Sequence, residues 1–378
     1  MKVPFNRPSL TANELPYIEQ ALKEAHLSAY GNFTKRCHSI LEEAIGVKSA
    51  FLTCSGSAAL EMAALLADIK AGDEVILPSF TFLTTASAFA LRGAIPVFVD
   101  VHPENMNINE ELVAAAIGPK TKAIVPVHYA GLPCNMDALQ AIAEKNNLLL
   151  IEDAAHALHS KYKGQEAGSF GAISILSFHA AKNVNSGEGG ALLVNDPDLI
   201  ERAKIIWDKG TNKGELSKGL VSFYSWQALS SAFAPSEITA AFLLAQLEQS
   251  REITQERSLI WNRYHEAFET LEAREHLKRP ALTADIQQNG HIYYLILNSQ
   301  NERDRLIEFL LAREISALFH YVPLHLSPAG KAYGRSHGNL PVTEDYSRRL
   351  LRLPVFKGLD LDSQAYVCRS VQEFFSRN

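Results

Sequence analysis

A single lysine lies in a glycine-rich polar turn between two apolar segments. Ala172–Ser177 and Ala191–Asn195 have the composition of buried strands, and the turn between them contains Lys182 and three glycines. A lysine amine can act as a nucleophile, or as an acid and base, when the protein desolvates it. Because lysine is usually a solvated surface residue, the interpretation of Lys182 depends on the polar residues that other segments bring to it.

A tight turn of small residues follows another apolar run. In T-C-S-G-S-A-A (53–59) a strand is expected to pass directly into a helix through Ser55, Gly56 and Ser57. Free amides at the helix start, the helix dipole and the two serine hydroxyls together form an anion pocket of phosphate size. An ordinary helix N-cap is the alternative. The segment lacks the endings typical of nucleoside triphosphate and dinucleotide loops.

A carboxylate and an aromatic ring complete a set of candidate ligands. Asp153 directly follows a buried apolar run, and a carboxylate in a partly desolvated crevice needs a cationic partner such as a protonated ring nitrogen. Phe82 offers a flat apolar face for such a ring. Helix capping by Asp153 and core packing of Phe82 are the alternatives. Pyridoxal 5′-phosphate (PLP) would use all four features, which are a phosphate pocket, an aromatic face, a carboxylate and a lysine.

The elements that position these residues alternate regularly. Short apolar runs, expected to be strands, alternate with segments of helical character between residues 50 and 151. The expected strands are Ala50–Thr53, Glu74–Leu77, Ile95–Val99, Ala123–Val127 and Leu148–Ile151, and the expected helices are Ala58–Asp68, Thr84–Arg92, Glu110–Ile117 and Met136–Lys145. This pattern predicts an α/β fold with a largely parallel sheet flanked by helices, and ligands at the carboxyl ends of its strands.

Two domains are expected, a large α/β domain over residues 1–245 and a smaller α+β domain over 246–378. A polar lead-in with helices at Asn13–Ala25 and Thr34–Ile45 precedes the large domain, residues 210–236 are loop-like, and a long helical segment from Ser236 to Leu271 contains the boundary near Gln246. The smaller domain is expected to contain a strand (His291–Leu297), a helix (Asn301–Arg313), a strand (Ser316–His320), an irregular loop through Gly338 and a final helix (Asp362–Phe375).

Composition excludes several classes of protein. The 378 residues have a formal net charge of −6, with lysines and arginines spread along the chain, so no nucleic-acid partner is expected. No apolar run approaches the length of a membrane span, and residues 1–10 lack the apolar centre of a signal peptide, which predicts a cytoplasmic location. The four cysteines are far apart and form no C-x-x-C pair, so neither disulfides nor a metal site is expected.

Several motifs carry a family resemblance over nearly the whole chain. S-G-S-A-A-L (55–60), V-P-V-H-Y-A-G (125–131), E-D-A-A-H-A (152–157), S-F-H-A-A-K-N (177–183) and G-E-G-G-A-L-L-V-N-D (187–196) resemble the DegT/DnrJ/EryC1 family of nucleotide-sugar aminotransferases, which has the aspartate-aminotransferase fold (fold type I). The resemblance implies that Lys182 binds the cofactor aldehyde and Asp153 pairs with the pyridine nitrogen. It also implies ring stacking by Phe82, phosphate binding by Gly56, Ser57 and Ser177, a place for His156 near the phenolic oxygen, and a homodimer with shared active sites.

A finer resemblance concerns the substrate. Segments 5–8, 31–37, 106–110, 208–212 and 318–330 most resemble the branch that converts dTDP-4-keto-6-deoxyglucose, with glutamate as amino donor, into dTDP-4-amino-4,6-dideoxygalactose for lipopolysaccharide or enterobacterial common antigen. His320, Tyr321 and His325 are the candidates for the sugar and diphosphate side. In many relatives an asparagine of one subunit contacts the cofactor phosphate bound in the partner subunit. This chain has Ala234 at the matching place, and Ser230 or Ser231 is a possible substitute.

Other functions stay open at this point. The same chemistry could give the gluco epimer or act on a 3-keto sugar. A sugar dehydratase of this fold would have histidine in place of Lys182, and a regulatory member would bind PLP without turnover. His128, His156 and His159 could in principle form the metal site of a hydrolase, although buried structural histidines are the more ordinary interpretation.

Overall fold

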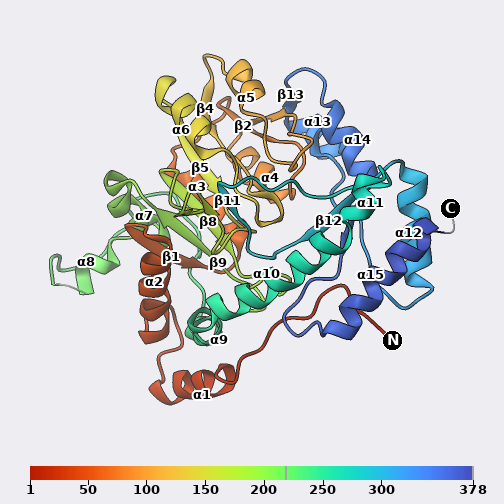
Figure 1. Ribbon diagram of the computed structural model, residues 1–378. Coiled ribbons are helices and arrows are strands. Elements are labelled where there is room, and N and C mark those ends of the chain that lie inside the picture. The colour runs from red at the N-terminus through yellow and green to blue at the C-terminus, as the bar shows by residue number, and fades with distance from the viewer. Residues whose placement is uncertain (218, 377–378) are drawn as a thin grey trace.

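The computed structural model describes residues 1–217 and 219–376 and is built around an eight-stranded sheet (Figure 1). In spatial order the strands are β1 (Ser49–Thr53), β9 (Gly190–Val194), β8 (Ile173–Ser177), β5 (Leu149–Asp153), β4 (Thr121–Ile124), β2 (Glu74–Pro78), β3 (Ile95–Val99) and β13 (Arg335–Ser336). Strand β9 runs antiparallel to both of its neighbours, and the other pairs are parallel. The prediction of a largely parallel sheet is therefore confirmed.

Apolar side chains on alternate positions of the central strands pack on opposite faces of the sheet. Leu192 and Val194 of β9 belong to a buried cluster with α3 and α7, whereas Leu193 belongs to a cluster with α2 and α9. The helices of this half are α1 (Glu14–Glu24), α2 (Asn32–Ile45), α3 (Gly56–Leu66), α4 (Thr84–Ala90), α5 (Glu110–Ala116), α6 (Met136–Lys145), α7 (Ile200–Trp207), α8 (Lys213–Ser217) and α9 (Glu237–Glu248). Burial on both faces explains the continuous apolar runs of the strands.

A second, smaller sheet organises the C-terminal residues. Its antiparallel strands are β10 (Leu277–Lys278), β12 (Tyr293–Leu297) and β14 (Leu350–Leu353), in that order, and the helices of this part are α10 (Ser250–Ala267), α11 (Glu269–Ala273), α12 (Gln300–Leu311), α13 (Pro328–Tyr333), α14 (Pro341–Arg349) and α15 (Leu361–Ser376). The long helix α10 leads from the large sheet towards this unit (Figure 1). Val3 packs in the same apolar cluster as β12 and α15, so the chain begins against the smaller unit.

Several short elements complete the fold. A third sheet pairs β11 (Ile286–Gln287) with β6 (Lys161–Tyr162), which also pairs with β7 (Gln165–Glu166), and 3₁₀ turns lie at Tyr129–Gly131, Pro197–Leu199 and Leu324–Leu326. Residue 246 lies in the last turn of α9, and the domain boundary placed there stays a prediction. The strand expected at Ser316–His320 is wrong, because only Leu318 forms a bridge there, to Arg352.

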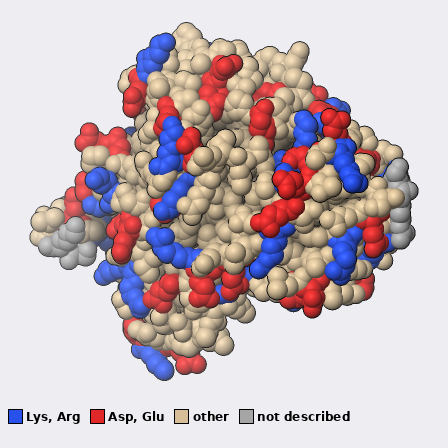
Figure 2. Space-filling view, in the orientation of Figure 1, with Lys and Arg blue, Asp and Glu red and all other residues tan. Residues whose placement is uncertain are grey.

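The face shown in Figure 2 is not dominated by one charge. Lysine and arginine side chains alternate there with aspartate and glutamate. No helix within the described residues combines the length and apolarity that a membrane span needs.

Candidate active site

A cavity of about 500 Å³ opens at the carboxyl ends of the central strands, between the large sheet and the smaller unit. It brings together all but one of the residues expected to bind the cofactor or the sugar within one subunit: Gly56, Ser57, Phe82, Asp153, His156, Ser177, Lys182, His320 and Tyr321. These residues come from segments that are far apart in the chain. The parallel order of β5 and β8, with β1 in the same direction, explains their convergence, because strand ends that point the same way meet at one edge.

His325 is the exception among the residues expected at the site. It does not line the cavity; its Nδ1 is hydrogen-bonded to Ser79 Oγ at 2.7 Å, and its Nε2 lies 3.4 Å from a carboxylate oxygen of Glu344. These contacts connect the 3₁₀ turn at Leu324–Leu326 to β2 and α14. In this structure the two ring nitrogens of His325 therefore face Ser79 and Glu344 and not the cavity.

The loop that carries Lys182 is fixed by its own backbone. The Lys182 amide donates to the His179 carbonyl, and the amides of Phe178 and Ala180 donate across the loop to Gly189 and Gly187, each at 2.8 Å. The side chain enters the cavity. Burial lowers the pKa of its amine to about 8, and the positive charge of Arg352 contributes, while Asp153 opposes the shift. Much more of this amine is neutral near pH 7 than for an ordinary lysine.

This lowered pKa predicts the pH dependence of the lysine's reactivity. Only the neutral amine is a nucleophile, so the rate at which the apoprotein combines with PLP should rise with pH and level off above about 8. For a lysine of ordinary pKa the rise would continue beyond about pH 10. Stopped-flow absorbance across this pH range measures the profile, and a rate that still climbs tenfold per pH unit between about pH 8.5 and 9.5 would contradict the structure.

Asp153 lies at the end of β5 with its carboxylate in the cavity. Its Oδ2 accepts a hydrogen bond from Thr85 Oγ1 at 2.8 Å, and its Oδ1 accepts from the Ala155 amide at 3.2 Å. Burial raises the pKa of this carboxyl, although both hydrogen bonds oppose the change. Within the described residues no lysine, arginine or histidine nitrogen forms an ion pair with it. A cationic group of a ligand would therefore gain a buried, preoriented partner.

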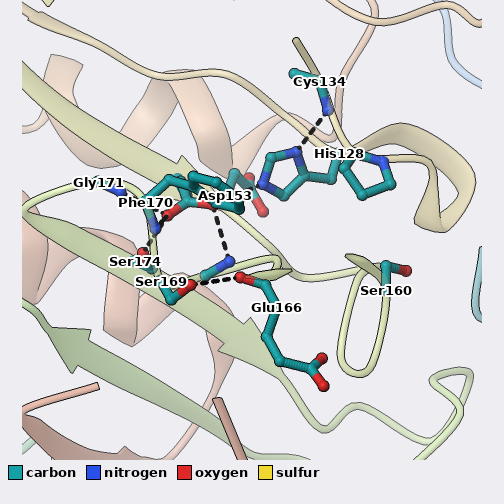
Figure 3. A network of polar contacts seen from close by, with 12 residues as sticks. His128, Cys134, Asp153, Ser160, Glu166, Ser169, Phe170, Gly171 and Ser174 are labelled. Atoms are coloured by element: carbon teal, nitrogen blue, oxygen red, sulfur yellow. Dashed lines mark hydrogen bonds and ion pairs between the residues drawn. The ribbon is translucent and has the colours of Figure 1, made fainter. Parts of the chain in front are cut away.

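The neighbouring carboxylate, Glu152, points to the other side of the strand and has a structural role. It accepts hydrogen bonds from the amides of Gly168, Phe170 and Gly171, from Ser174 Oγ, and from His128. Figure 3 shows this polar network with His128, Phe170, Gly171 and Ser174 labelled. Burial opposes ionisation of Glu152, but His128 and the amides hold the pKa of its carboxyl below the usual value. Alternation along β5 thus separates a structural acid from one that faces the cavity.

The three histidines of the hydrolase alternative do not converge. His128 is hydrogen-bonded to Glu152 at 2.9 Å, and His159 to Ser250 Oγ at 2.9 Å, while His156 faces the cavity. Among residues 1–217 and 219–376 no group of three histidine, cysteine, aspartate or glutamate side chains is placed to hold a metal ion. The separate positions of these three histidines do not support a metal-dependent hydrolase.

The turn expected to bind phosphate lies in the cavity, where α3 begins. Ser55 Oγ caps this helix by accepting from the Ala58 amide at 3.0 Å, and Ser55 also lines the cavity. Ser57 and the start of the helix line the cavity. Gly56 packs against Ser177, since a Cβ at residue 56 would lie 2.9 Å from the Ser177 Cβ. This leaves the first amides of α3 open to an anion.

Gly190, at the start of β9, packs closely against this turn. A Cβ at residue 190 would lie 2.5 Å from the carbonyl carbon and oxygen of Ser55, so Gly190→Ala must displace the turn. We expect the affinity for PLP to fall about tenfold or more, because overpacking costs about 1–3 kcal/mol. Titration of the apoprotein with PLP measures this loss.

Gly214→Ala is the matched control for that variant. A Cβ at residue 214 would meet nothing within 4 Å, so its PLP affinity should equal that of the unchanged protein. Equal affinities for all three proteins would show that the contact between Gly190 and Ser55 does not shape the pocket.

Aromatic and imidazole rings form the remaining wall. The rings of His156 and His291 lie 4.4 Å apart between centroids, and His320 Nδ1 is hydrogen-bonded to the Tyr129 hydroxyl at 2.9 Å. Nδ1 of His156 is buried and has no hydrogen-bond partner among the described residues. Burial lowers the pKa of His156 well below its usual range, so the ring is neutral. Phe82 is half exposed in the cavity, where a flat ligand could cover it.

The sequence interpretation missed several residues of this cavity. Phe5, Thr85, Arg257, His291 and Arg352 line it as well. Four of these residues lie in segments that the sequence interpretation did not connect with the site. Among them, Phe5 lies in the part of the chain that was interpreted only as a lead-in. The basic residues carried the clearest signal, since a cation inside an otherwise apolar run such as L-L-R-L (350–353) is unusual for a buried strand.

The residues present fit PLP. The cavity offers an amine of lowered pKa, a carboxylate that lacks a cation, a helix start shaped by two glycines and an exposed aromatic face. Together with the mixed eight-stranded sheet, these features define a PLP-dependent enzyme of fold type I.

Comparison with known proteins gives the family. Residues 8–372 match the model of the DegT/DnrJ/EryC1/StrS aminotransferase family, and the chain belongs to this family of PLP-dependent sugar aminotransferases. It is 31% identical over 374 residues to the GDP-perosamine synthase of Escherichia coli O157:H7, covering 99% of both chains. It is 30% identical over 379 residues to the spore coat polysaccharide biosynthesis protein SpsC of Bacillus subtilis, covering 98% of this chain and 96% of the relative.

A solved structure supports the fold and the cofactor. The PLP form of Spr1654 from Streptococcus pneumoniae superposes with a TM-score of 0.91 at 26% identity, covering 100% of this chain and 99% of that one. The cofactor is therefore PLP, as the cavity indicates.

Proposed function

We propose that the protein transfers the amino group of glutamate to a nucleotide-linked 4-keto-6-deoxy sugar. The observation that supports this most strongly is the pairing, in one cavity, of a lysine of lowered pKa with a buried carboxylate that has no cation of its own. An amine and a preoriented acid at the end of a phosphate pocket are what PLP-dependent amino transfer requires of a protein. Bound PLP supplies an aldehyde that accepts the amino group and a ring that delocalises the electrons released at the reacting carbon.

Each residue has a proposed task in this reaction. Lys182 would bind the cofactor covalently, and its amine would serve as the acid and base at the donor's α-carbon. Asp153 would hold a proton on the ring nitrogen. Phe82 would cover the ring, and His156, neutral and with a buried nitrogen that has no partner among the described residues, would face the phenolic oxygen. Gly56, Ser57 and Ser177 would hold the phosphate.

The substrate proposal is dTDP-4-keto-6-deoxy-D-glucose, with dTDP-4-amino-4,6-dideoxy-D-galactose as product, for a cell-surface polysaccharide. It rests on the resemblance of residues 318–330 and the other segments given above. The names of the two relatives agree with this class of reaction: one is a GDP-perosamine synthase and the other is a spore coat polysaccharide biosynthesis protein. His320 and Tyr321, which line the cavity with rings 3.4 Å apart between centroids, are the proposed contacts to the sugar.

We further propose that the active protein is a homodimer. The segment 220–229 exposes more than half of the surface of Leu220, Phe223, Tyr224, Trp226 and Leu229, an apolar surface that a second copy would bury. Ser230 and Ser231 follow directly. Ser230 Oγ donates to the Ile206 carbonyl, which leaves Ser231 as the better substitute for the missing asparagine, and Ala234 packs against the core next to α3.

Product analysis by NMR tests the proposed reaction. After incubation with glutamate and dTDP-4-keto-6-deoxyglucose, a C4 amine in the axial position is expected. An equatorial C4 amine would support the gluco alternative, and turnover of only a 3-keto sugar would contradict amination at C4. Binding of PLP with no amino transfer from glutamate would instead indicate a regulatory protein.

A further inference from the structure

Two residues that line the cavity, Lys182 and His291, have complementary polar atoms without partners. The amine of Lys182 donates to none of residues 1–217 and 219–376, and the Nε2 atom of His291 has no hydrogen bond to any of them either. The other ring nitrogen, Nδ1, is bonded to Asn183, so Nε2 is the atom left open to the cavity. An imidazole nitrogen accepts a hydrogen bond only where it carries no proton. The tautomer of His291 therefore decides whether its ring can accept from the lysine amine.

Asn183 determines this tautomer. Its Nδ2 lies 2.8 Å from the carbonyl oxygen of Asn289, which can only accept, so the amide nitrogen of Asn183 has to be the group that faces it. The amide oxygen of Asn183 then lies 2.9 Å from His291 Nδ1, and this oxygen can only accept as well. The proton of a neutral His291 ring is therefore on Nδ1, which leaves a free lone pair on Nε2. Asn183 directly follows Lys182, so it belongs to the loop that carries the lysine.

The ring of His291 is neutral and its backbone is fixed. Burial lowers the pKa of His291 well below its usual range, and the charge of Lys182 contributes. The His291 amide donates to Asn289 Oδ1 at 3.1 Å, and the His291 carbonyl accepts from Arg257 Nη2 at 2.9 Å. Because the backbone is held on both sides, the ring cannot exchange its two nitrogens without breaking its bond to Asn183.

The space that Lys182 and His291 share is small. Both residues line a second cavity of about 10 Å³, together with His156 and Asn183. This volume is enough for about one water molecule. A hydrogen bond in such a buried place is stronger than in bulk water, because few other dipoles screen it. A single water can therefore connect the donor on Lys182 with the acceptor on His291.

We propose that His291 accepts a hydrogen bond from the free amine of Lys182 through one water molecule, and that Asn183 is the positioning residue that makes His291 an acceptor. The inference rests on the proposed role of Lys182. The lone pair of His291 favours the charged amine, as Asp153 does, and it opposes burial, which favours the neutral amine. The other titratable and charged groups that act on one or both residues are Asp153, His156, His320, Arg257 and Arg352.

The tautomer can be measured on the unchanged protein. In apoprotein labelled with nitrogen-15 histidine, the couplings between ring nitrogens and ring protons show by NMR which nitrogen of each histidine is protonated. The signals of His291 are those that disappear in His291→Phe. A proton on Nδ1 at neutral pH is expected. A proton on Nε2 would overturn the proposal, whether or not any variant of Asn183 folds.

Removal of the acceptor should shift the pH profile of PLP attachment to Lys182. In His291→Phe the midpoint should be lower than in the unchanged protein by about half to one pH unit, because a hydrogen bond that favours the charged amine is lost. The matched control is His26→Phe, since His26 is exposed and lies outside the cavity, and its midpoint should not move. An unchanged midpoint in His291→Phe would mean that His291 does not act on the lysine.

Asn183→Leu tests whether Asn183 acts through His291. Leucine is close to asparagine in size but has no oxygen for Nδ1, so the midpoint should move in the same direction as in His291→Phe. The double variant should match His291→Phe alone within about 0.3 pH unit, because the acceptor is already absent. Shifts that add, or a loss of PLP affinity without any shift, would overturn the positioning role. Failure to aminate any keto sugar would refute the proposed function and leave these results standing.

Discussion

Lys182→Ala should abolish amino transfer, with a loss in kcat of about 10⁴-fold or more. The substitution removes both the covalent attachment of the cofactor and the amine that moves the proton, and nothing else in the cavity replaces them, because the nearby histidines His156, His291 and His320 all have pKa values well below the usual range. Steady-state assay with glutamate and the keto sugar measures this loss. PLP should still bind, since the phosphate pocket and Asp153 are intact.

Lys120→Ala is the matched control for this variant. Lys120 is exposed at the loop before β4, and its backbone carbonyl, which the substitution keeps, accepts from the Glu74 amide. Its activity should equal that of the unchanged protein. Retention of more than about one-tenth of the activity in Lys182→Ala would mean that the amine is not the acid and base of the reaction.

Asp153→Asn should lower kcat about 10²- to 10⁴-fold while PLP still binds. An amide has nearly the shape of the carboxylate and can still accept from Thr85, but it cannot stabilise a positive charge on the ring nitrogen. Because Asp153 raises the pKa of Lys182, its loss should also shift the pH profile of cofactor attachment to lower pH. Both effects can be measured on one preparation, by assay and by absorbance.

Asp137→Asn is the corresponding control, since Asp137 pairs with Lys163 on the surface and lies outside the cavity. Full activity of Asp153→Asn would place the ring nitrogen away from Asp153, and an unchanged pH profile would contradict the charge interaction between Asp153 and Lys182.

Much of the large sheet and its site followed from sequence patterns, because burial on both faces leaves continuous apolar runs. The strand Ile95–Val99 and the helix Met136–Lys145 have the predicted ends, and the polar residues after β1, β5 and β8 converge as expected. The end of β4 was misplaced: Pro126 has no amide hydrogen for the ladder, so the strand stops at Ile124.

The C-terminal unit was harder to predict, and with it part of the site. Strand β14 has only four residues, directly follows the polar helix α14, and has a cation inside its short apolar run. Arg352 therefore had no assigned element. The pairing of β14 with β12, which brings it to the cavity, depends on contacts distant in sequence. His325 looked equivalent to His320, and only the packing on Ser79 separates them.

The covalent bond between Lys182 and the cofactor is the most direct test of the proposed chemistry. Reduction of the PLP-bound protein with borohydride, followed by proteolysis and mass spectrometry, should place the phosphopyridoxyl group on the peptide that contains Lys182. Modification of another lysine, or an unmodified Lys182 in protein that retains stoichiometric PLP, would contradict the central role of this residue.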